Sequence, residues 1–236
     1  MPSILITGAN QGLGLEFTRQ YAADGWTVIA CCRTPESADS LAELAADHDT
    51  ISIEKLDIRD HAAIGALGQK YTNMPLDILL NNAGIIGPIP IAEHIERQHF
   101  GKMDYEVWRD VIETNTFAPV KMAETFIDNL AAGEQKKLVN ISSQLASITE
   151  RIIPAIAYSS SKTALNRTMT IIADQLKERG IIVAIFCPGQ VKTRMDFGSA
   201  TVEIEQSISA LRPLIAALTL DDTGSFRDHE GRTIAW

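Results

Sequence analysis

The stretch Ser3-Ile-Leu-Ile-Thr-Gly-Ala-Asn-Gln-Gly-Leu-Gly14 decides the fold. A short apolar run ends at a glycine-rich turn. An amphipathic pattern follows, in which Leu13, Phe17 and Tyr21 recur at four-residue intervals. Such a run is typical of a buried strand, and such a pattern is typical of a helix with one apolar face. The stretch therefore predicts a strand, a tight turn and a helix, in that order.

The same alternation of short apolar runs and longer amphipathic segments continues along the chain. The runs are rich in Ile, Val and Leu on both faces, as parallel strands buried between helices are. The predicted strands are Ser3 to Ile6, Thr27 to Cys31, Ile51 to Leu56, Asp77 to Leu80, Lys137 to Ile141 and Ile181 to Phe186, with a short final strand near Thr233 to Ala235.

Apolar residues recur at three- and four-residue spacing in three further segments, and each stripe predicts a helix that packs on the sheet. The stripes run from Val111 to Leu130, from Leu165 to Leu176 and from Ile204 to Leu218. Strands and helices that alternate in this way predict an α/β fold, a doubly wound parallel sheet of about seven strands with helices on both faces. No long linker or repeat interrupts the pattern, so residues 1–236 are expected to form a single domain.

Composition limits the partners. The chain carries 21 Lys and Arg against 30 Asp and Glu, a formal net charge of −9, and is not expected to bind nucleic acid or an anionic membrane. No apolar run approaches the roughly 20 residues of a membrane-spanning helix, and the first residues do not resemble a signal peptide. A cytoplasmic location is the resulting expectation. Cys31, Cys32 and Cys187 are expected to be reduced and to pack in the interior.

The glycine-rich turn indicates a dinucleotide site. Gly8 permits the tight backbone of a strand-to-helix turn. Gly12 and Gly14 would let a pyrophosphate approach the helix N-terminus, where free amides and the helix dipole favour an anion. A purely structural turn is the alternative, but a position between a strand and a helix is the one that a nucleotide site requires.

The residues at the ends of the second, third and fourth predicted strands indicate which dinucleotide binds. The second strand ends at Cys31-Cys32-Arg33, without the acid that often holds the ribose of NAD, and Arg33 could pair with the 2′-phosphate of NADP. NADP is therefore the expected cofactor, with NAD possible, and an ordinary surface arginine is the alternative. Asp57 is expected either to contact adenine or to cap the helix that begins near Asp60. Asn81 to Gly84 closes the fourth strand and could border the cofactor.

Tyr158 and Lys162 are four residues apart in an apparent helix, so their side chains project from one face. An ammonium held near a phenol lowers the pKa of the phenol, which would give a group able to donate or accept a proton near neutral pH. A solvated helix face is the alternative for the pair alone. Gly84 to Gly101 and Val191 to Thr201 follow strand ends and are expected to form walls or lids of a pocket.

Several motifs occur in a fixed order along the chain. They are TGANQGLG, NNAG, Asn115, the Asn-Ile-Ser-Ser segment ending at Ser143, Tyr158-x-x-x-Lys162 and Pro188-Gly189. In this order, and over essentially its whole length, the sequence resembles the short-chain dehydrogenase/reductase superfamily in its single-domain Rossmann form. Within the superfamily it is similar to the C-factor and sniffer-like carbonyl reductases, in the long segment after NNAG and in the ending from Phe226 to Trp236.

The resemblance implies four catalytic positions. Tyr158 would be the general acid in reduction, and Lys162 would lower the pKa of the tyrosine and hold the nicotinamide ribose. Ser143 would hydrogen-bond the substrate carbonyl, and Asn115 would bind a water that links Lys162 to solvent. From the residues alone, an Asn115 amide bonded to neighbouring backbone is equally expected, and Ser142 cannot be distinguished from Ser143.

The resemblance also implies cofactor-binding residues at several strand ends. Pro188 and Gly189 resemble the turn beneath the nicotinamide, and Thr193 matches a position that contacts the carboxamide or a phosphate. Gln11 departs from the pattern, because many NADP-preferring members carry a basic residue in its place. The expected cofactor-binding residues are Gly8, Asn10, Gln11, Gly12, Leu13, Gly14, Arg33, Asp57, Ile58, Asn82, Ala83, Gly84, Tyr158, Lys162, Pro188, Gly189, Val191 and Thr193.

We therefore expect an NADP(H)-dependent oxidoreductase that transfers hydride between the nicotinamide and a carbonyl or secondary alcohol, with Tyr158 moving the proton. Two alternatives stay open: an NAD-linked alcohol dehydrogenase, and a non-catalytic dinucleotide-sensing protein. The expected partner is a small carbonyl or alcohol substrate, and by resemblance alone the chain is expected to form a homodimer or homotetramer. No metal is expected, because the two histidines of Glu93 to His99 are five residues apart, and a solvated loop is predicted there.

Overall fold

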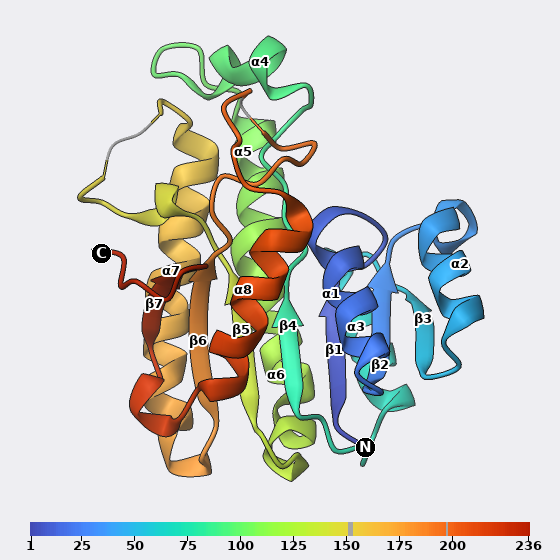
Figure 1. Ribbon diagram of the computed structural model, residues 1–236. Coiled ribbons are helices and arrows are strands. Elements are labelled where there is room, and N and C mark those ends of the chain that lie inside the picture. The colour runs from blue at the N-terminus through green and yellow to red at the C-terminus, as the bar shows by residue number, and fades with distance from the viewer. Residues whose placement is uncertain (151–152, 197) are drawn as a thin grey trace.

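A parallel sheet in the order β3-β2-β1-β4-β5-β6-β7 forms the centre of the computed structural model (Figure 1). The structure describes residues 1–150, 153–196 and 198–236, so residue 197 of the expected wall Val191 to Thr201 lies outside the described residues. The order reverses between β1 and β4, which is where doubly wound sheets bind ligands. The strands are β1 Ser3–Thr7, β2 Thr27–Cys32, β3 Ile51–Lys55, β4 Ile78–Asn81, β5 Lys137–Ile141, β6 Ile182–Cys187 and β7 Ser225–Asp228.

Helices cover both faces of the sheet (Figure 1). Side chains of α1, α2 and α8 form one buried cluster with the sheet, and those of α3, α6 and α7 form the other. Burial of both faces explains why the strands are apolar throughout rather than alternating. The helices are α1 Gly12–Ala23, α2 Asp39–Asp47, α3 His61–Lys70, α4 Ile91–His94, α5 Tyr105–Ile112, α6 Ala118–Ala132, α7 Ile156–Leu176 and α8 Ile204–Ala217.

The expected α/β fold and six of the expected strands are confirmed, but the seventh strand was placed wrongly. β7 is Ser225–Asp228, not Thr233 to Ala235, and Phe226 pairs beside Ile185 of β6. Thr233 makes only an isolated antiparallel bridge to Arg227. The strand was missed because a single buried aromatic, Phe226, holds it against the sheet, while its other residues are polar.

The apolar stripe from Val111 to Leu130 is not one uniform helix. α5 ends at Ile112, a π-helical turn η3 spans Glu113–Phe117, and α6 continues from Ala118. Asn115 lies in this turn and is fully buried. Widened turns of this kind often occur at functional sites, because they reorient one side chain without ending the helix.

The prediction of a solvated loop at Glu93 to His99 is wrong. The segment forms α4 and a 3-10 turn η2 at Ile95–Gln98, and the side chain of Gln98 is completely buried. The segment is a compact insertion that packs above the carboxyl ends of the strands (Figure 1). Its two histidines and charged residues gave no apolar pattern from which a helix could be predicted.

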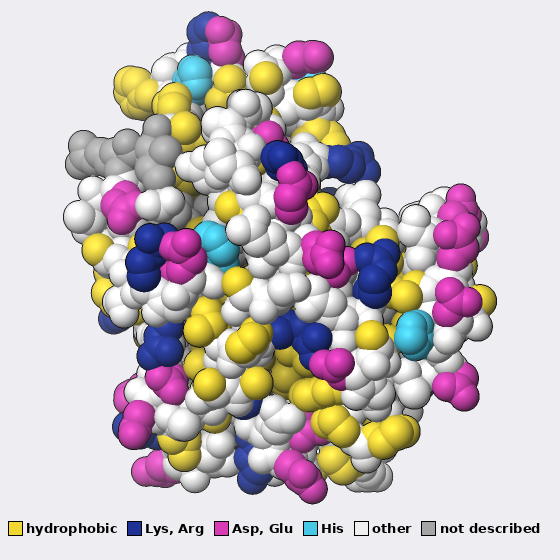
Figure 2. Space-filling model, viewed as in Figure 1, with side chains coloured by type: hydrophobic (Ala, Val, Ile, Leu, Met, Phe, Trp, Pro, Cys, Tyr) yellow, Lys and Arg dark blue, Asp and Glu magenta, His cyan; other side chains and the backbone are white. Residues whose placement is uncertain are grey.

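Charged side chains are intermingled over the face seen in Figure 2. Acidic side chains gather at the edge formed by α2 and the turn before it, where Glu36, Asp39, Glu43 and Asp47 are exposed. Among the described helices, none has both the length and the apolar character that crossing a membrane requires.

Two glycines provide a test of packing. A methyl group at Gly133, where α6 ends, would lie 2.1 Å from the carbonyl oxygen of Leu76, whereas a methyl group at Gly65 within α3 would meet no atom within 4 Å. Gly133→Ala is expected to lower the free energy of unfolding by about 1–3 kcal/mol. Gly65→Ala, the matched control, is expected to raise it by about 0.5–1 kcal/mol. Urea unfolding followed by circular dichroism measures both, and equal effects would contradict the described packing.

Candidate active site

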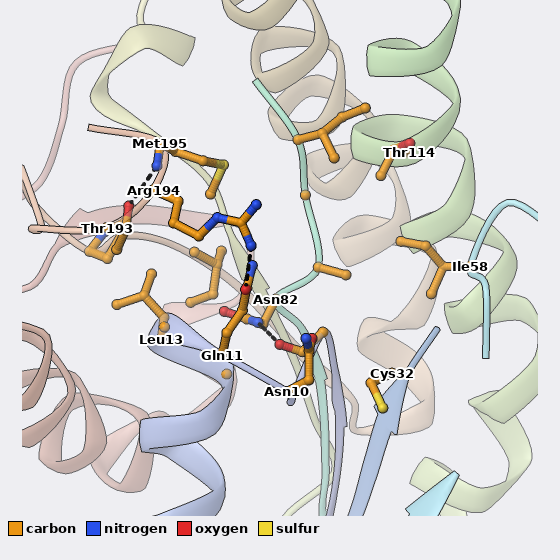
Figure 3. A pocket seen from close by; sticks show the side chains of 18 of the residues that line it. Asn10, Gln11, Leu13, Cys32, Ile58, Asn82, Thr114, Thr193, Arg194 and Met195 are labelled. Carbon is orange, nitrogen blue, oxygen red and sulfur yellow. Dashed lines mark hydrogen bonds between the residues drawn. The ribbon is translucent and has the colours of Figure 1, made fainter. Parts of the chain in front are cut away.

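A cavity of about 600 Å³ opens at the carboxyl edge of the sheet, where the strand order reverses between β1 and β4. Residues from the ends of β1, β2, β4 and β5 line it, together with α7 and the segment after β6 (Figure 3). The expected glycine-rich turn and the pair Tyr158 and Lys162 all lie on this one cavity. Sequence segments more than 140 residues apart are thus brought to one site.

The glycine-rich turn needs its glycines for two different reasons. Gly8 and Gly12 have φ of +70° and +56°, a left-handed conformation that other residues rarely adopt. Gly14 is required by contact, because a methyl group there would lie 2.2 Å from the carbonyl oxygen of Gly8 and 2.6 Å from Asn82 Nδ2. The close approach that Gly14 permits is therefore to the protein itself.

Asn82 holds the glycine-rich turn against β4. Its Nδ2 donates to the carbonyl oxygens of Thr7 at 2.9 Å and Gly8 at 3.3 Å. In return, the Thr7 hydroxyl accepts hydrogen bonds from the backbone amides of Asn82 and Ala83, both at 3.1 Å. Gln11, the N-cap of α1, makes no side-chain cap, so the first-turn amides of α1 are left for another acceptor.

Basic side chains surround the end of the cavity near β2 and β3. Arg33 is exposed on its wall, and Arg59 lines it too. Asp57 accepts hydrogen bonds from the Arg59 backbone amide at 3.0 Å and from its guanidinium at 3.3 Å. Burial would raise the pKa of Asp57, but these bonds outweigh it and lower the pKa. Asp60, not Asp57, caps α3, by accepting from the Ala63 amide at 2.9 Å.

The segment after β6 reaches across the cavity mouth. Arg194 donates a hydrogen bond to Gln11 Oε1 at 2.8 Å, which joins residues 183 positions apart (Figure 3). Thr193 accepts from the Met195 amide at 3.2 Å. A basic residue therefore does occupy the neighbourhood of Gln11, but a different part of the chain supplies it.

The two serines after β5 have different roles. Ser142 is buried, and its hydroxyl donates to Asn166 Oδ1 of α7 at 2.7 Å. The Ser143 side chain lies close enough to the Tyr158 phenol to lower its pKa, and its oxygen accepts a hydrogen bond from the Leu145 amide. The structure thus separates the two residues, and it is Ser143 that faces the tyrosine.

Lys162 is 4% exposed, and its Nζ donates to the carbonyl oxygen of Ile141 at 2.8 Å. Cys187, at the end of β6, is also buried, and its sulfur accepts from the Gln144 amide at 3.2 Å. Burial raises the pKa of this thiol. Tyr158, Lys162 and Cys187 form one partly desolvated group at the carboxyl edge of the sheet.

Burial dominates the pKa values of Tyr158 and Lys162. It raises the pKa of the phenol to about 12, although Ser143 lowers it in part. It lowers the pKa of the Lys162 ammonium to about 8. Loss of water disfavours the charged form of each group. At neutral pH the phenol keeps its proton, and the expected lowering of its pKa by Lys162 stays a prediction.

Asn115 is bonded to backbone on both sides of its amide. Its Oδ1 accepts from the Ile85 amide at 2.8 Å, and its Nδ2 donates to the Ile85 carbonyl at 2.7 Å and to the Ser161 hydroxyl at 3.0 Å. These contacts match the alternative left open from the residues alone. They fix the segment after β4, and the water-binding role stays a prediction.

Most of the expected cofactor-binding residues line the cavity, with two exceptions. Gly189 lies beneath the ring of His229, and Val191 is buried in a bridge with Val202. The expected residues that do line the cavity are Gly8, Asn10, Gln11, Gly12, Leu13, Gly14, Arg33, Asp57, Ile58, Asn82, Ala83, Gly84, Tyr158, Lys162, Pro188 and Thr193.

Four lining residues were expected only as members of a pocket wall. Ile85 lies in the segment Gly84 to Gly101, and Lys192, Arg194 and Met195 lie in the segment Val191 to Thr201. Arg59 is a basic residue two positions from Asp57, and that proximity was the signal that could have found it. The lining residues that were not expected are Cys32, Leu56, Arg59, Thr114, Ile141, Ser142 and Ile204.

The cleft at the reversal of a doubly wound sheet, with a tyrosine and a lysine beside a glycine-rich turn, defines an oxidoreductase of the α/β class. Residues 2–201 match the family model of the short chain dehydrogenase. The chain belongs to the short-chain dehydrogenase/reductase family.

Solved structures and a characterised relative support a likeness to carbonyl reductases. The chain matches the NADPH-bound carbonyl reductase from chicken fatty liver at 29% identity and a TM-score of 0.89, over 100% of this chain and 99% of that one. It matches the carbonyl reductase Sniffer of D. melanogaster at 28% identity and a TM-score of 0.89, over the full length of both. It is 29% identical to (+)-neomenthol dehydrogenase of Arabidopsis thaliana, over 87% of this chain and 88% of that protein.

The buried ammonium predicts a gain of stability when it is removed. The pKa of Lys162 is lowered from 10.5 to about 8 in the folded protein. The buried charge therefore lowers the free energy of unfolding by its full amount below pH 8. This destabilisation decreases between pH 8 and pH 10.5 and is absent above pH 10.5. Lys162→Met is expected to raise the free energy of unfolding at pH 7 by about 1–3 kcal/mol. This value allows for the loss of the hydrogen bond to the Ile141 carbonyl. Urea unfolding at pH 7 and pH 10 measures this. An equal gain at both would contradict the described burial.

Proposed function

We propose that the protein is an NADP(H)-dependent carbonyl reductase in which Tyr158 gives the proton to the substrate oxygen. The observation that carries the proposal is that Tyr158 and Lys162 line the same cavity as the glycine-rich turn. A proton donor and a dinucleotide site in one cleft are what the interconversion of a carbonyl and an alcohol requires.

The residues on the cavity fit NADP. The free amides of the first turn of α1 and the dipole of that helix favour a phosphate. Five cationic side chains on the cavity add positive charge: Arg33, Arg59, Lys162, Lys192 and Arg194. No acid stands at Cys32, where NAD-binding sheets often place one. The NADPH named with the chicken carbonyl reductase agrees with this choice.

The chemistry divides between the cofactor and the chain. Bound NADPH supplies the hydride to the carbonyl carbon. Tyr158 donates its proton to the carbonyl oxygen, since the phenol is protonated at neutral pH. Ser143 stays beside the phenol and supplies a second hydrogen bond to the same oxygen. Lys162, with a pKa lowered to about 8, remains mostly protonated at pH 7 and is held by Ile141.

The substrate is proposed to be a lipophilic or aromatic carbonyl compound. Ile85 and Met195 both line the cavity, one from the segment after β4 and the other from the segment after β6. Apolar walls favour an apolar substrate, because a polar substrate would lose hydrogen bonds to water that these walls cannot replace. The alcohol in the name of the relative (+)-neomenthol dehydrogenase is of this apolar kind.

Tyr158→Phe removes the proton donor and keeps the ring. It is expected to lower kcat by about 100- to 10,000-fold, because general acid catalysis contributes that much, while the Kd for NADPH stays within about twofold since only the hydroxyl is lost. Loss of NADPH absorbance with an aromatic aldehyde measures kcat, and quenching of protein fluorescence measures Kd.

Tyr105→Phe is the matched control, because Tyr105 is an exposed tyrosine on α5 that does not line the cavity. Normal turnover by Tyr158→Phe would refute the assignment of the proton donor. Tight NADPH binding by the wild type without turnover on a broad panel of aldehydes and ketones would favour a dinucleotide-sensing protein instead.

The choice of NADP over NAD is tested at Arg33. Arg33→Asp places a carboxylate where a 2′-phosphate would lie, and the ratio of kcat/KM with NADPH to that with NADH is expected to fall by about 10- to 100-fold, the value of one charge-assisted pair. Arg19→Asp, an exposed arginine of α1 outside the cavity, should leave the ratio unchanged. A wild type that prefers NADH would support an NAD-linked alcohol dehydrogenase.

A further inference from the structure

Gln98 is a fully buried glutamine between β4 and α5, at the end of the turn η2. Both halves of its amide are hydrogen-bonded. Nε2 donates to the carbonyl oxygen of Ile86 at 2.6 Å, and Oε1 accepts from the backbone amide of Tyr158 at 3.0 Å. A buried amide with both ends satisfied is held in one orientation, because any other would leave a polar group unpaired.

The amide that Gln98 accepts from is one that the helix cannot satisfy. α7 begins at Ile156, so Tyr158 lies in its first turn, where backbone amides have no partner within the helix. Such amides are usually satisfied by the residue before the helix, but Ala155 has no side chain that can do so. Gln98 therefore caps α7 from a position 60 residues earlier in the chain.

Other contacts from the same region hold the same turn. Trp108 of α5 donates from Nε1 to the Ser160 hydroxyl at 2.9 Å. Ala157 is fully buried in a small cluster with Val107 and Val111 of α5. The start of α7 thus packs on α5 and on the segment before it.

The segment that carries Gln98 also forms a wall of the cavity. Ile85, on that wall, is fixed through both of its backbone groups by Asn115, and the next residue, Ile86, receives the hydrogen bond from Gln98. Gly87 has φ +113°, and a methyl group there would lie 2.9 Å from Gln98 Nε2. The space around the glutamine is filled, so its position is tied to that of the wall.

We propose that Gln98 is a positioning residue for the proton donor. It fixes the first turn of α7 to the cavity wall at Ile86, and it thereby sets where the Tyr158 phenol meets the substrate oxygen. Gln98 does not line the cavity and touches no reacting atom. The proposal rests on the proposed function of Tyr158 and assigns a second role to the segment Gly84 to Gly101, beyond that of a wall.

Gln98→Met tests the proposal, since methionine has a similar size and neither hydrogen bond. It is expected to lower kcat by about tenfold, because small displacements of a catalytic group cost rates of this order, while the Kd for NADPH stays within about twofold. A purely structural role would lower the amount of folded protein and leave kcat per folded molecule unchanged. Arg97→Met is the matched control, since the side chain of the neighbouring Arg97 is exposed and pairs with Asp104, and its kcat should equal that of the wild type.

Hydrogen exchange gives a readout that does not depend on turnover. The Tyr158 amide should exchange at least about tenfold faster in Gln98→Met than in the wild type or Arg97→Met, because it has lost its acceptor. Gln98→Glu keeps an acceptor for the Tyr158 amide in either protonation state, so that amide should stay protected and the kcat of the variant should fall less. If Gln98→Met does not fold, Gln98→Glu is compared with the wild type in its place.

The outcomes separate this proposal from the proposed function. Wild-type protein without reductase activity overturns the function, and exchange still tests the contact. An active wild type with unchanged kcat and unchanged exchange in Gln98→Met overturns the role of Gln98 alone. Loss of protection at Tyr158 in folded Gln98→Glu overturns it as well, because the retained acceptor would then not hold the helix.

Discussion

A buried ammonium is the constraint on which the rest of the site depends. The hydrogen bond from Lys162 Nζ to the carbonyl oxygen of Ile141, 2.8 Å long, joins α7 to the end of β5 and brings Tyr158 to the carboxyl edge of the sheet. Gly84 leaves room for the neighbouring amide, since a methyl group there would lie 3.1 Å from Asn115 Oδ1. Removing a charge from water costs free energy that one carbonyl only partly returns. Burial of Lys162 therefore lowers the stability of the folded protein, but it fixes the positions of Lys162 and Tyr158 at the edge of the sheet.

Much of the fold and of the site could be predicted from local patterns. Apolar runs such as Lys137–Ile141 identified strands, because a strand buried on both faces has no polar side. Parallel strands end at a common edge, so Gly8, Asn82 and the Ser143 segment could be assigned to one cleft before any coordinates were known. The spacing of Tyr158 and Lys162 on one helix added the proposed proton donor. The order of these motifs, more than any one of them, indicated the family.

The rest could not be predicted, because it consists of contacts between segments with no pattern of their own. Gln98 lies among charged residues and prolines, yet it caps a helix 60 residues away. Arg194 meets Gln11 across the cavity, so the missing basic residue comes from another part of the chain. The pKa of Tyr158 depends on how far water is excluded, which spacing along a helix does not reveal. In each case tertiary packing, rather than local sequence, decides the outcome.

The three cysteines are all buried, and burial raises the pKa of Cys31, Cys32 and Cys187. Cys187 is close enough to Tyr158 to influence the pKa of the phenol. The thiolate, not the thiol, is the nucleophilic form of a cysteine. Burial therefore keeps the sulfur of Cys187, next to the cleft, in its unreactive protonated form.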